Sequence, residues 1–109
     1  MNISIIGTGY VGLVSGVCLA ELGHRVWCVD RDRGKVEQIA AGKSPIHEKG
    51  LEELLARAIR GRLRATTNLQ EAVVDSDLTL IAVGTPFDGR RIDLSFVRQA
   101  AREIGEALT

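Results

Sequence analysis

The sequence lacks a charge imbalance: 14 lysines and arginines offset 14 aspartates and glutamates among its 109 residues, so the formal net charge is zero. A balanced chain exerts no global attraction on nucleic acid or on a membrane surface. The sequence also has no apolar run long enough to cross a bilayer, and it starts directly with a strand pattern rather than with a signal peptide. We therefore expect a cytoplasmic protein without nucleic-acid or membrane partners.

Cysteine is also scarce, and Cys18 and Cys28 are the only two. Their spacing matches no metal-binding pattern and both fall in apolar stretches, so we expect two reduced core residues rather than catalytic thiols or metal ligands. Internal repeats and low-complexity linkers are absent. The composition, 45% hydrophobic and 26% charged, is that of an ordinary globular protein. The length predicts one domain over residues 1–109.

A glycine motif near the start of the chain is the most informative pattern present. A short apolar strand that ends at Ile6 leads directly into GTGYVG at residues 7–12, and a small-residue helix follows. Gly7 permits a tight turn, Gly9 lets the backbone approach a pyrophosphate, and Gly12 allows close packing of helix on strand. Because the first N–H groups of the helix have no intrahelical partners, they can hold an anion.

The next apolar strand, at residues 26–29, is followed by an acidic residue, Asp30. Its carboxylate can accept hydrogen bonds from an adenosine ribose, and it would repel the 2′-phosphate of NADP. We therefore predict a dinucleotide site and favour NAD. Arg31 and Arg33 leave NADP open, since an arginine here can accommodate that phosphate, and FAD proteins use a similar motif. A plain strand–helix connection would explain the glycines but not Asp30.

The rest of the chain alternates strands with helices. Short apolar runs predict two more strands, at residues 63–67 and 78–83. Helices are expected after the motif, between Asp32 and Gly42, from about Gly50, over residues 69–74 and after Asp93. This alternation predicts an α/β fold: a Rossmann-type parallel sheet of about four strands in the order 3-2-1-4, with helices on both faces.

Three expectations concern burial. The helix after the motif has two apolar stripes, so it should be buried between the sheet and other elements. The near-continuous apolar run at residues 78–83 predicts a strand covered on both faces, and the final helix should bury one stripe. The stripes are Val11, Val14, Cys18 and Leu22 with Leu13, Val17 and Ala20 in the first helix, and Leu94, Val97, Ala101, Ile104 and Leu108 in the last.

The strand order also predicts where a ligand binds. Ligands of such sheets lie beyond the carboxyl ends of the strands, where the strand order reverses. This point falls between the first and fourth strands. The loop at residues 7–12 should therefore line the same crevice as Val83, Gly84 and Thr85, which follow the fourth strand.

Five separated motifs give the chain a more specific resemblance. They are GTGYVGL, GKSPI, GLE, TTN and VGTP, at residues 7–13, 42–46, 50–52, 66–68 and 83–86. In this order they resemble the N-terminal domain of the UDP-glucose/GDP-mannose dehydrogenase family over essentially the whole chain. The resemblance implies NAD as the cofactor. Enzymes of this family oxidise the C6 hydroxyl of a nucleotide sugar to a carboxylate in two NAD-dependent steps, with a catalytic cysteine and with lysine and asparagine or aspartate helpers.

The resemblance also implies particular NAD contacts. Carried over by position, these come from Tyr10 and Val11 at the phosphate loop, Asp30 and Lys35 at the ribose end, and Thr85 in the crevice. The residues agree, because Lys35 lies early in the helix after Asp30 and could reach the ribose or a phosphate; a solvated lysine is the alternative. Arg31 could stack on the adenine or remain a plain surface arginine.

The main departure from the family is what the chain does not contain. The catalytic cysteine, its helpers and the sugar-binding segment come after the region that ends at Thr109, and Cys18 and Cys28 match none of them. We therefore expect the NAD-binding portion of a nucleotide-sugar 6-dehydrogenase, inactive alone. Its nucleotide-sugar substrate would bind through the missing C-terminal part, and the full-length protein would be a homo-oligomer. A smaller departure is Lys49, where the family usually has proline.

Two other functions stay open. One is a stand-alone NAD-sensing or regulatory module. A cysteine-bearing domain in the same reading frame would argue against it. The other is the N-terminal part of a 3-hydroxyacid-type dehydrogenase, which the motifs at residues 44–46 and 84–86 disfavour. The choice among UDP-glucose, GDP-mannose and N-acetyl sugars is also open, because those contacts lie outside the chain.

Overall fold

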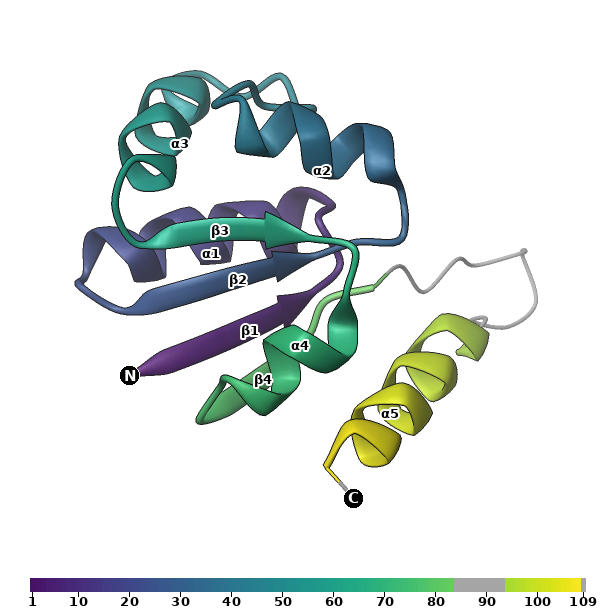
Figure 1. Ribbon diagram of the computed structural model, residues 1–109. Coiled ribbons are helices and arrows are strands. Elements are labelled where there is room, and N and C mark those ends of the chain that lie inside the picture. Colours follow the sequence, from purple (N-terminus) through teal and green to yellow (C-terminus); the bar gives the residue numbers. More distant parts are fainter. Residues whose placement is uncertain (84–93, 109) are drawn as a thin grey trace.

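The computed structural model describes residues 1–83 and 94–108, in which strands and helices alternate. The elements are β1 (Asn2–Ile6), α1 (Tyr10–Glu21), β2 (Arg25–Val29), α2 (Arg33–Ala40), α3 (Leu51–Ile59), β3 (Leu63–Thr66), α4 (Leu69–Val74), β4 (Leu78–Ile81) and α5 (Ser95–Ala107). The strands form a parallel sheet in the order β3-β2-β1-β4, with helices on both faces (Figure 1). The predicted Rossmann-type fold and its strand order are confirmed. In the described part of the chain, no helix is long and apolar enough to span a membrane.

Alternate side chains of the strands face two separate cores. Ile5 of β1 and Cys28 of β2 pack with apolar residues of α1, α2 and α3. Ile6 and Val29, the next residue along each strand, pack with apolar residues of α4 and α5 on the opposite face. This two-residue period is that of a strand buried on both sides. The two cores hold the central strands so that their carboxyl ends meet at one edge of the sheet.

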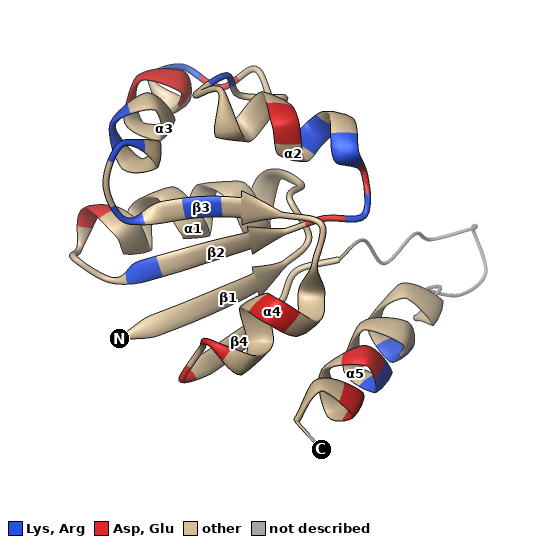
Figure 2. Ribbon diagram, in the orientation of Figure 1, with Lys and Arg blue, Asp and Glu red and all other residues tan. Residues whose placement is uncertain are grey.

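A local cap places α2 directly after β2. The Oδ1 atom of Asp32 accepts a hydrogen bond from the backbone N–H of Lys35 at 3.2 Å. Short acidic side chains favour this position because the first N–H groups of a helix have no other partner. The N-cap predicted at Asp32 is therefore confirmed, and Lys35 lies in the first turn of α2, which carries basic residues (Figure 2).

β4 is less covered than its sequence predicts. It lies at the edge of the sheet and, among the strands that the structure describes, pairs with β1 alone. Leu78, Leu80 and Ile81 remain 37% to 45% exposed. The expectation of a strand covered on both faces is therefore wrong. An apolar run indicates that a strand can be buried, but it does not supply the neighbours that would bury it.

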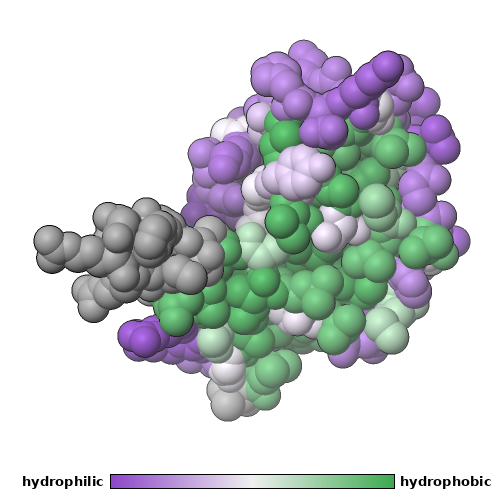
Figure 3. All heavy atoms as spheres, turned by 180° about the vertical axis from the view of Figure 1, so that it is seen from behind, coloured by the Kyte–Doolittle hydropathy of each residue, from purple (hydrophilic) through white to green (hydrophobic). Residues whose placement is uncertain are grey.

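α1 is buried along one stripe only, so the expectation that both would be buried is wrong. The sheet covers one side of the helix, and apolar residues elsewhere on α1 stay at the surface. Hydrophobic residues gather on the side of the molecule that lies behind in Figure 1, as Figure 3 shows. The buried stripe is Leu13, Val17 and Ala20. Of the other stripe, Val11, Cys18 and Leu22 are exposed and Val14 is half-buried.

The side of α5 that faces the core overlaps only in part with the predicted stripe. Ala100 is its buried residue, and Ile104 and Ala107 pack beside it against the apolar cluster that includes α4. Ala101 is exposed, because residues 100, 104 and 107 already form the side that faces α4. Within the predicted stripe, Leu94 and Leu108 are exposed while Val97 and Ile104 are half-buried. Asp93, the predicted cap, lies outside the described residues.

The two cysteines have different surroundings. Cys28 is fully buried in β2, and burial raises the pKa of its thiol to about 12. Cys18 is exposed on α1. The expectation of a core cysteine is confirmed for Cys28 and wrong for Cys18, because Cys18 belongs to the stripe of α1 that the sheet leaves uncovered.

This difference predicts selective labelling. A maleimide should modify Cys18 in the folded protein and leave Cys28 unmodified, because the thiolate is the reactive form and Cys28 is both buried and protonated. Mass spectrometry of peptides labelled with and without denaturant measures this. A Cys18→Ser variant, as control, should take up label only after unfolding. Rapid labelling of Cys28 in the native protein would contradict the burial seen here.

Candidate functional site

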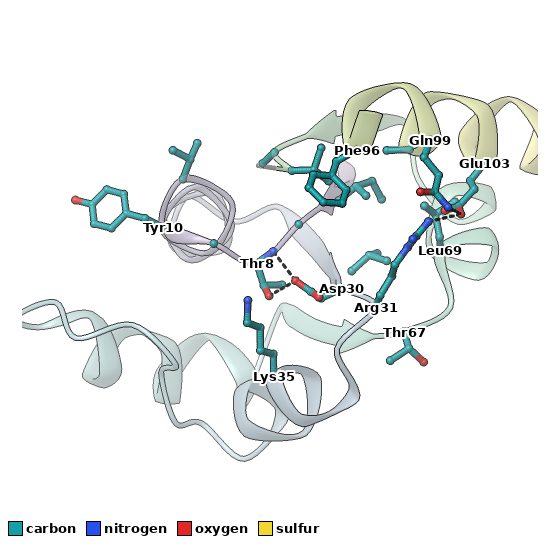
Figure 4. Close-up of a pocket in the computed structure, with 18 residues that line it drawn as sticks. Thr8, Tyr10, Asp30, Arg31, Lys35, Thr67, Leu69, Phe96, Gln99 and Glu103 are labelled. Carbon is teal, nitrogen blue, oxygen red and sulfur yellow. Dashed lines mark hydrogen bonds and ion pairs between the residues drawn. The ribbon is translucent and has the colours of Figure 1, made fainter. Parts of the chain in front are cut away.

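A cavity of about 780 Å³ opens beyond the carboxyl ends of β1 and β2 (Figure 4). The loop after β1, the residues after β2 and β4, the start of α2 and one side of α5 all contribute to its lining. This is the position at which the strand order predicts a ligand. The predicted site residues that line the cavity are Gly7, Gly9, Tyr10, Val11, Asp30, Arg31, Lys35 and Val83.

Of the other three predicted residues, one lies away from the cavity and two fall outside the described residues. Gly12 does not line the cavity and instead lies in α1 against the end of β1, where an added Cβ would come within 2.1 Å of the carbonyl oxygen of Gly7. Its role is close packing of helix on strand, as the motif predicts. Gly84 and Thr85 lie outside the described residues.

Gly7 turns the chain out of β1. Its φ is 109°, and its N–H donates a hydrogen bond to the carbonyl oxygen of Val29 at 2.7 Å. A Cβ on Gly7 would lie 2.7 Å from the carbonyl oxygen of Ala82. Glycine is needed on both counts, since it alone adopts positive φ readily and leaves room for a neighbouring backbone. The loop is therefore held between the ends of β2 and β4.

Gly9 leaves the start of α1 open toward the cavity. Its backbone is extended (φ −73°, ψ −169°), no side chain caps the helix, and no acidic residue lies in the first turn. A Cβ built on Gly9 would meet no atom within 4 Å. The first N–H groups of a helix lack intrahelical partners and carry a partial positive charge. Since Tyr10 and Val11 line the cavity, this end of α1 can hold an anion there.

The carboxylate of Asp30 is bound firmly at the edge of the cavity. Its Oδ2 atom accepts hydrogen bonds from the hydroxyl of Thr8 at 2.6 Å and from the backbone N–H of Thr8 at 3.1 Å. Its Oδ1 atom accepts a third from the backbone N–H of Asp32 at 2.9 Å. The loop after β1 and the turn after β2 therefore meet on one carboxylate (Figure 4).

These contacts decide the ionisation of Asp30. Partial burial alone would raise the pKa of the carboxyl group. The hydrogen bonds from Thr8 and Asp32, together with the positive charge of Lys35, outweigh burial and lower the pKa below its ordinary value. The site therefore keeps a negative charge at neutral pH, and Lys35 points toward it in Figure 4.

Arg31, which lines the cavity, reaches to α5. Its Nη2 atom lies 2.7 Å from Oε1 of Glu103, in an ion pair with a hydrogen bond. The side chain of Gln99 approaches the same Glu103 oxygen at 3.5 Å. Both partners of the ion pair are partly exposed, so the pair adds little stability. The ion pair does direct the guanidinium of Arg31 toward α5 rather than toward Asp30.

The sequence does not predict several of the side chains that line the cavity. Thr8 lies inside the predicted motif, but the motif is defined by its glycines and gives no role to the residue between them. The helix α5 supplies three more, at spacings of three and four residues, which places them on one side of the helix. That spacing is a signal from which this side of α5 could have been predicted. The larger or polar residues missed are Thr8, Thr67, Leu69, Phe96, Gln99 and Glu103.

Comparison with known protein families and sequences gives a consistent result. The model of the UDP-glucose/GDP-mannose dehydrogenase family, NAD binding domain, matches residues 1–109. The UDP-glucose 6-dehydrogenase of Rhizobium meliloti is 53% identical over 112 residues, covering 99% of this chain and 25% of that protein. The GDP-mannose 6-dehydrogenase of Azotobacter vinelandii is 46% identical over 110 residues, with the same coverage.

Solved structures agree in fold. The chain superposes on a GDP-mannose dehydrogenase of Pseudomonas aeruginosa, determined as a ternary complex, with a TM-score of 0.96 and 47% identity. That match covers 99% of this chain and 25% of the other. A UDP-glucose dehydrogenase of Pyrobaculum islandicum gives a TM-score of 0.92 with 45% identity, covering 97% of this chain and 25% of the other. The chain thus spans about a quarter of the length of the relatives that it matches.

Proposed function

The chain belongs to the UDP-glucose/GDP-mannose dehydrogenase family, as its NAD-binding domain, and from this premise we propose that it is the cofactor-binding portion of a nucleotide-sugar 6-dehydrogenase. The reaction proposed for the whole protein is oxidation of the C6 hydroxyl of a UDP- or GDP-sugar to the uronic acid. Bound NAD would supply the hydride acceptor. The observation that carries the proposal is one cavity with two recognition points: the open start of α1 and the Asp30 carboxylate.

These two points suit the two ends of an adenosine diphosphate group. We assign the pyrophosphate to the first N–H groups of α1, where Gly9 leaves room for close approach. We assign the adenosine ribose to Asp30, with Lys35 beside it. A ribose hydroxyl can donate a hydrogen bond to a carboxylate, and the lowered pKa of Asp30 keeps its carboxylate ionised and able to accept one. Val83 lies at the same crevice, and Gly84 and Thr85 remain proposed contacts.

Catalysis is assigned to residues outside this chain. Cys28 is buried in the core, and the exposed Cys18 does not line the cavity, so neither thiol can reach a substrate bound there. The chain covers about a quarter of its relatives. We therefore place nucleotide-sugar binding, the catalytic nucleophile and homo-oligomer contacts in further segments of a cytoplasmic enzyme. A stand-alone NAD-responsive module is the second candidate, supported by the completeness of the two recognition points within residues 7–35.

Calorimetric titration of the 109-residue chain with NAD, NADP and FAD tests the proposal. NAD should bind weakly, because part of the cofactor stays in water when no second half closes over it. NADP should bind less tightly still, since its 2′-phosphate would face Asp30. The chain alone should oxidise neither UDP-glucose nor GDP-mannose. Tighter binding of NADP or FAD, or measurable sugar oxidation, would overturn the assignment of cofactor or of catalysis respectively.

A further inference from the structure

We propose that Thr8 is a positioning residue for the cofactor: its hydroxyl and N–H hold the Asp30 carboxylate in the one orientation that binds the NAD ribose and rejects NADP. The inference rests on the proposed function, because it assigns a role within the same site. The glycine motif gives this residue no role, yet Thr8 supplies two of the three hydrogen bonds described here to Asp30, and its hydroxyl makes the shortest of them.

The geometry around Thr8 is that of a built contact. Thr8 is 1% exposed, and its hydroxyl lies 2.6 Å from Oδ2 of Asp30. The backbone N–H of Thr8 reaches the same oxygen at 3.1 Å, although the two residues are 22 positions apart. Two donors on one oxygen leave the carboxylate little freedom to rotate, because rotation would break both hydrogen bonds at once.

The remaining capacity of Asp30 points to where a ribose binds. An ionised carboxylate has about four acceptor positions, two on each oxygen. Thr8 takes both positions on Oδ2, and the N–H of Asp32 takes one on Oδ1. One position on Oδ1 is left for a ribose hydroxyl. Thr8 therefore orients the carboxylate before the cofactor arrives, which lowers the entropic cost of binding.

The charged groups around Asp30 explain why its orientation matters for NADP. Lys35 lies close enough to favour the ionised carboxylate. Arg31, which could accommodate a 2′-phosphate, is directed to Glu103 of α5 at 2.7 Å. Arg33 is not among the residues that line the cavity. With the carboxylate fixed and Arg31 directed toward α5, a 2′-phosphate at the ribose would meet the negative charge of Asp30. A carboxylate free to swing aside would weaken that rejection.

A Thr8→Val variant removes the hydroxyl at nearly constant volume, and Thr8→Ser restores it. For Thr8→Val, NAD affinity should fall by about threefold to tenfold, less than for loss of a direct hydrogen bond from the cofactor to a charged group, because Thr8 acts through the Asp30 carboxylate. The preference for NAD over NADP should shrink as well, and Thr8→Ser should recover both. Thr79→Val is a matched control, because it removes another hydroxyl pair, to Ser4 at 2.8 Å, away from the cavity. It should leave both affinities unchanged.

A double-mutant cycle with Asp30→Asn separates positioning from a merely structural effect. If Thr8 acts through the carboxylate, Thr8→Val should change the NAD/NADP preference of the Asp30→Asn background far less than that of the wild type. The same comparison with Thr8→Ala serves if valine prevents folding. A folded Thr8→Val or Thr8→Ala protein with wild-type affinity and preference would overturn the inference. Wild-type protein that binds no NAD would instead overturn the proposed function.

Discussion

Replacing Asp30 with alanine is expected to lower NAD affinity by about tenfold or more. A hydrogen bond to a charged acceptor contributes about 1.5–3 kcal/mol, and about 1.4 kcal/mol corresponds to a factor of ten. Asp30 lines the cavity beyond the end of β2 and keeps its charge at neutral pH. Discrimination against NADP should relax in the same variant, because the charge that repels a 2′-phosphate is gone.

The structure adds a cost in stability to this variant. Alanine leaves three donors without their acceptor: the hydroxyl and N–H of Thr8 and the N–H of Asp32. We expect the free energy of unfolding to fall by about 1–3 kcal/mol, as is usual when partly buried donors lose their partner. Asp30→Asn is the matched control, since its amide oxygen can still accept from Thr8 while the charge is absent. It should fold better than Asp30→Ala and still lose NADP discrimination.

The acid range provides an independent check on Asp30. Its pKa in the folded protein lies below the ordinary value of 3.8. The ionised carboxylate therefore stabilises the fold fully at pH values above that ordinary value, and this contribution disappears as the pH falls through the lower folded pKa. The stability difference between wild type and Asp30→Asn, from urea unfolding, should be constant near neutrality and shrink in strong acid. Unchanged NAD binding by a folded Asp30→Ala protein would show that the carboxylate is not at the ribose.

Local patterns in the sequence predict a structural feature correctly where that feature depends on residues close together in the chain. Asp32 caps α2 as predicted because the cap bonds a residue three positions on. The strand order follows because parallel strands joined by helices have few connections open to them. Burial was predicted less well. The helical stripe predicts burial of Cys18 and the apolar run predicts burial of Leu80, but both side chains are exposed.

The candidate site shows the same division. Gly7, Gly9 and Asp30 line the cavity, as their places at the ends of the first two strands predict. The pairing of Arg31 with Glu103 was not, since it joins residues 72 positions apart and depends on how α5 packs. Thr8 is an intermediate case, which the sequence predicts only in part. Its position is fixed by the motif, but its bond to Asp30 becomes visible only when the ends of β1 and β2 are placed side by side.

Substitutions of Gly9 and Gly12 should have opposite effects, the first on cofactor binding and the second on the stability of the fold. Gly9→Val should abolish measurable NAD binding while the protein still folds. A Cβ on Gly9 has no atom within 4 Å, and the φ of −73° suits any residue. The loss of a favourable cap costs up to about 1 kcal/mol. The branched side chain would, however, occupy the space through which a pyrophosphate must approach the first N–H groups of α1.

Gly12→Ala, although a smaller change, should damage the fold instead. Its Cβ would lie 2.1 Å from the carbonyl oxygen of Gly7 and 3.3 Å from the Cβ of Ala82. The first of these neighbours is backbone of the Gly7 turn rather than a flexible side chain, so α1 must move away from β1. We expect unfolding free energy to fall by about 1–3 kcal/mol or more. Circular dichroism in urea and NAD calorimetry on the same samples separate the two effects. Normal NAD binding by a folded Gly9→Val protein would falsify the pyrophosphate assignment, and a fully stable Gly12→Ala protein would contradict the packing of α1 on β1.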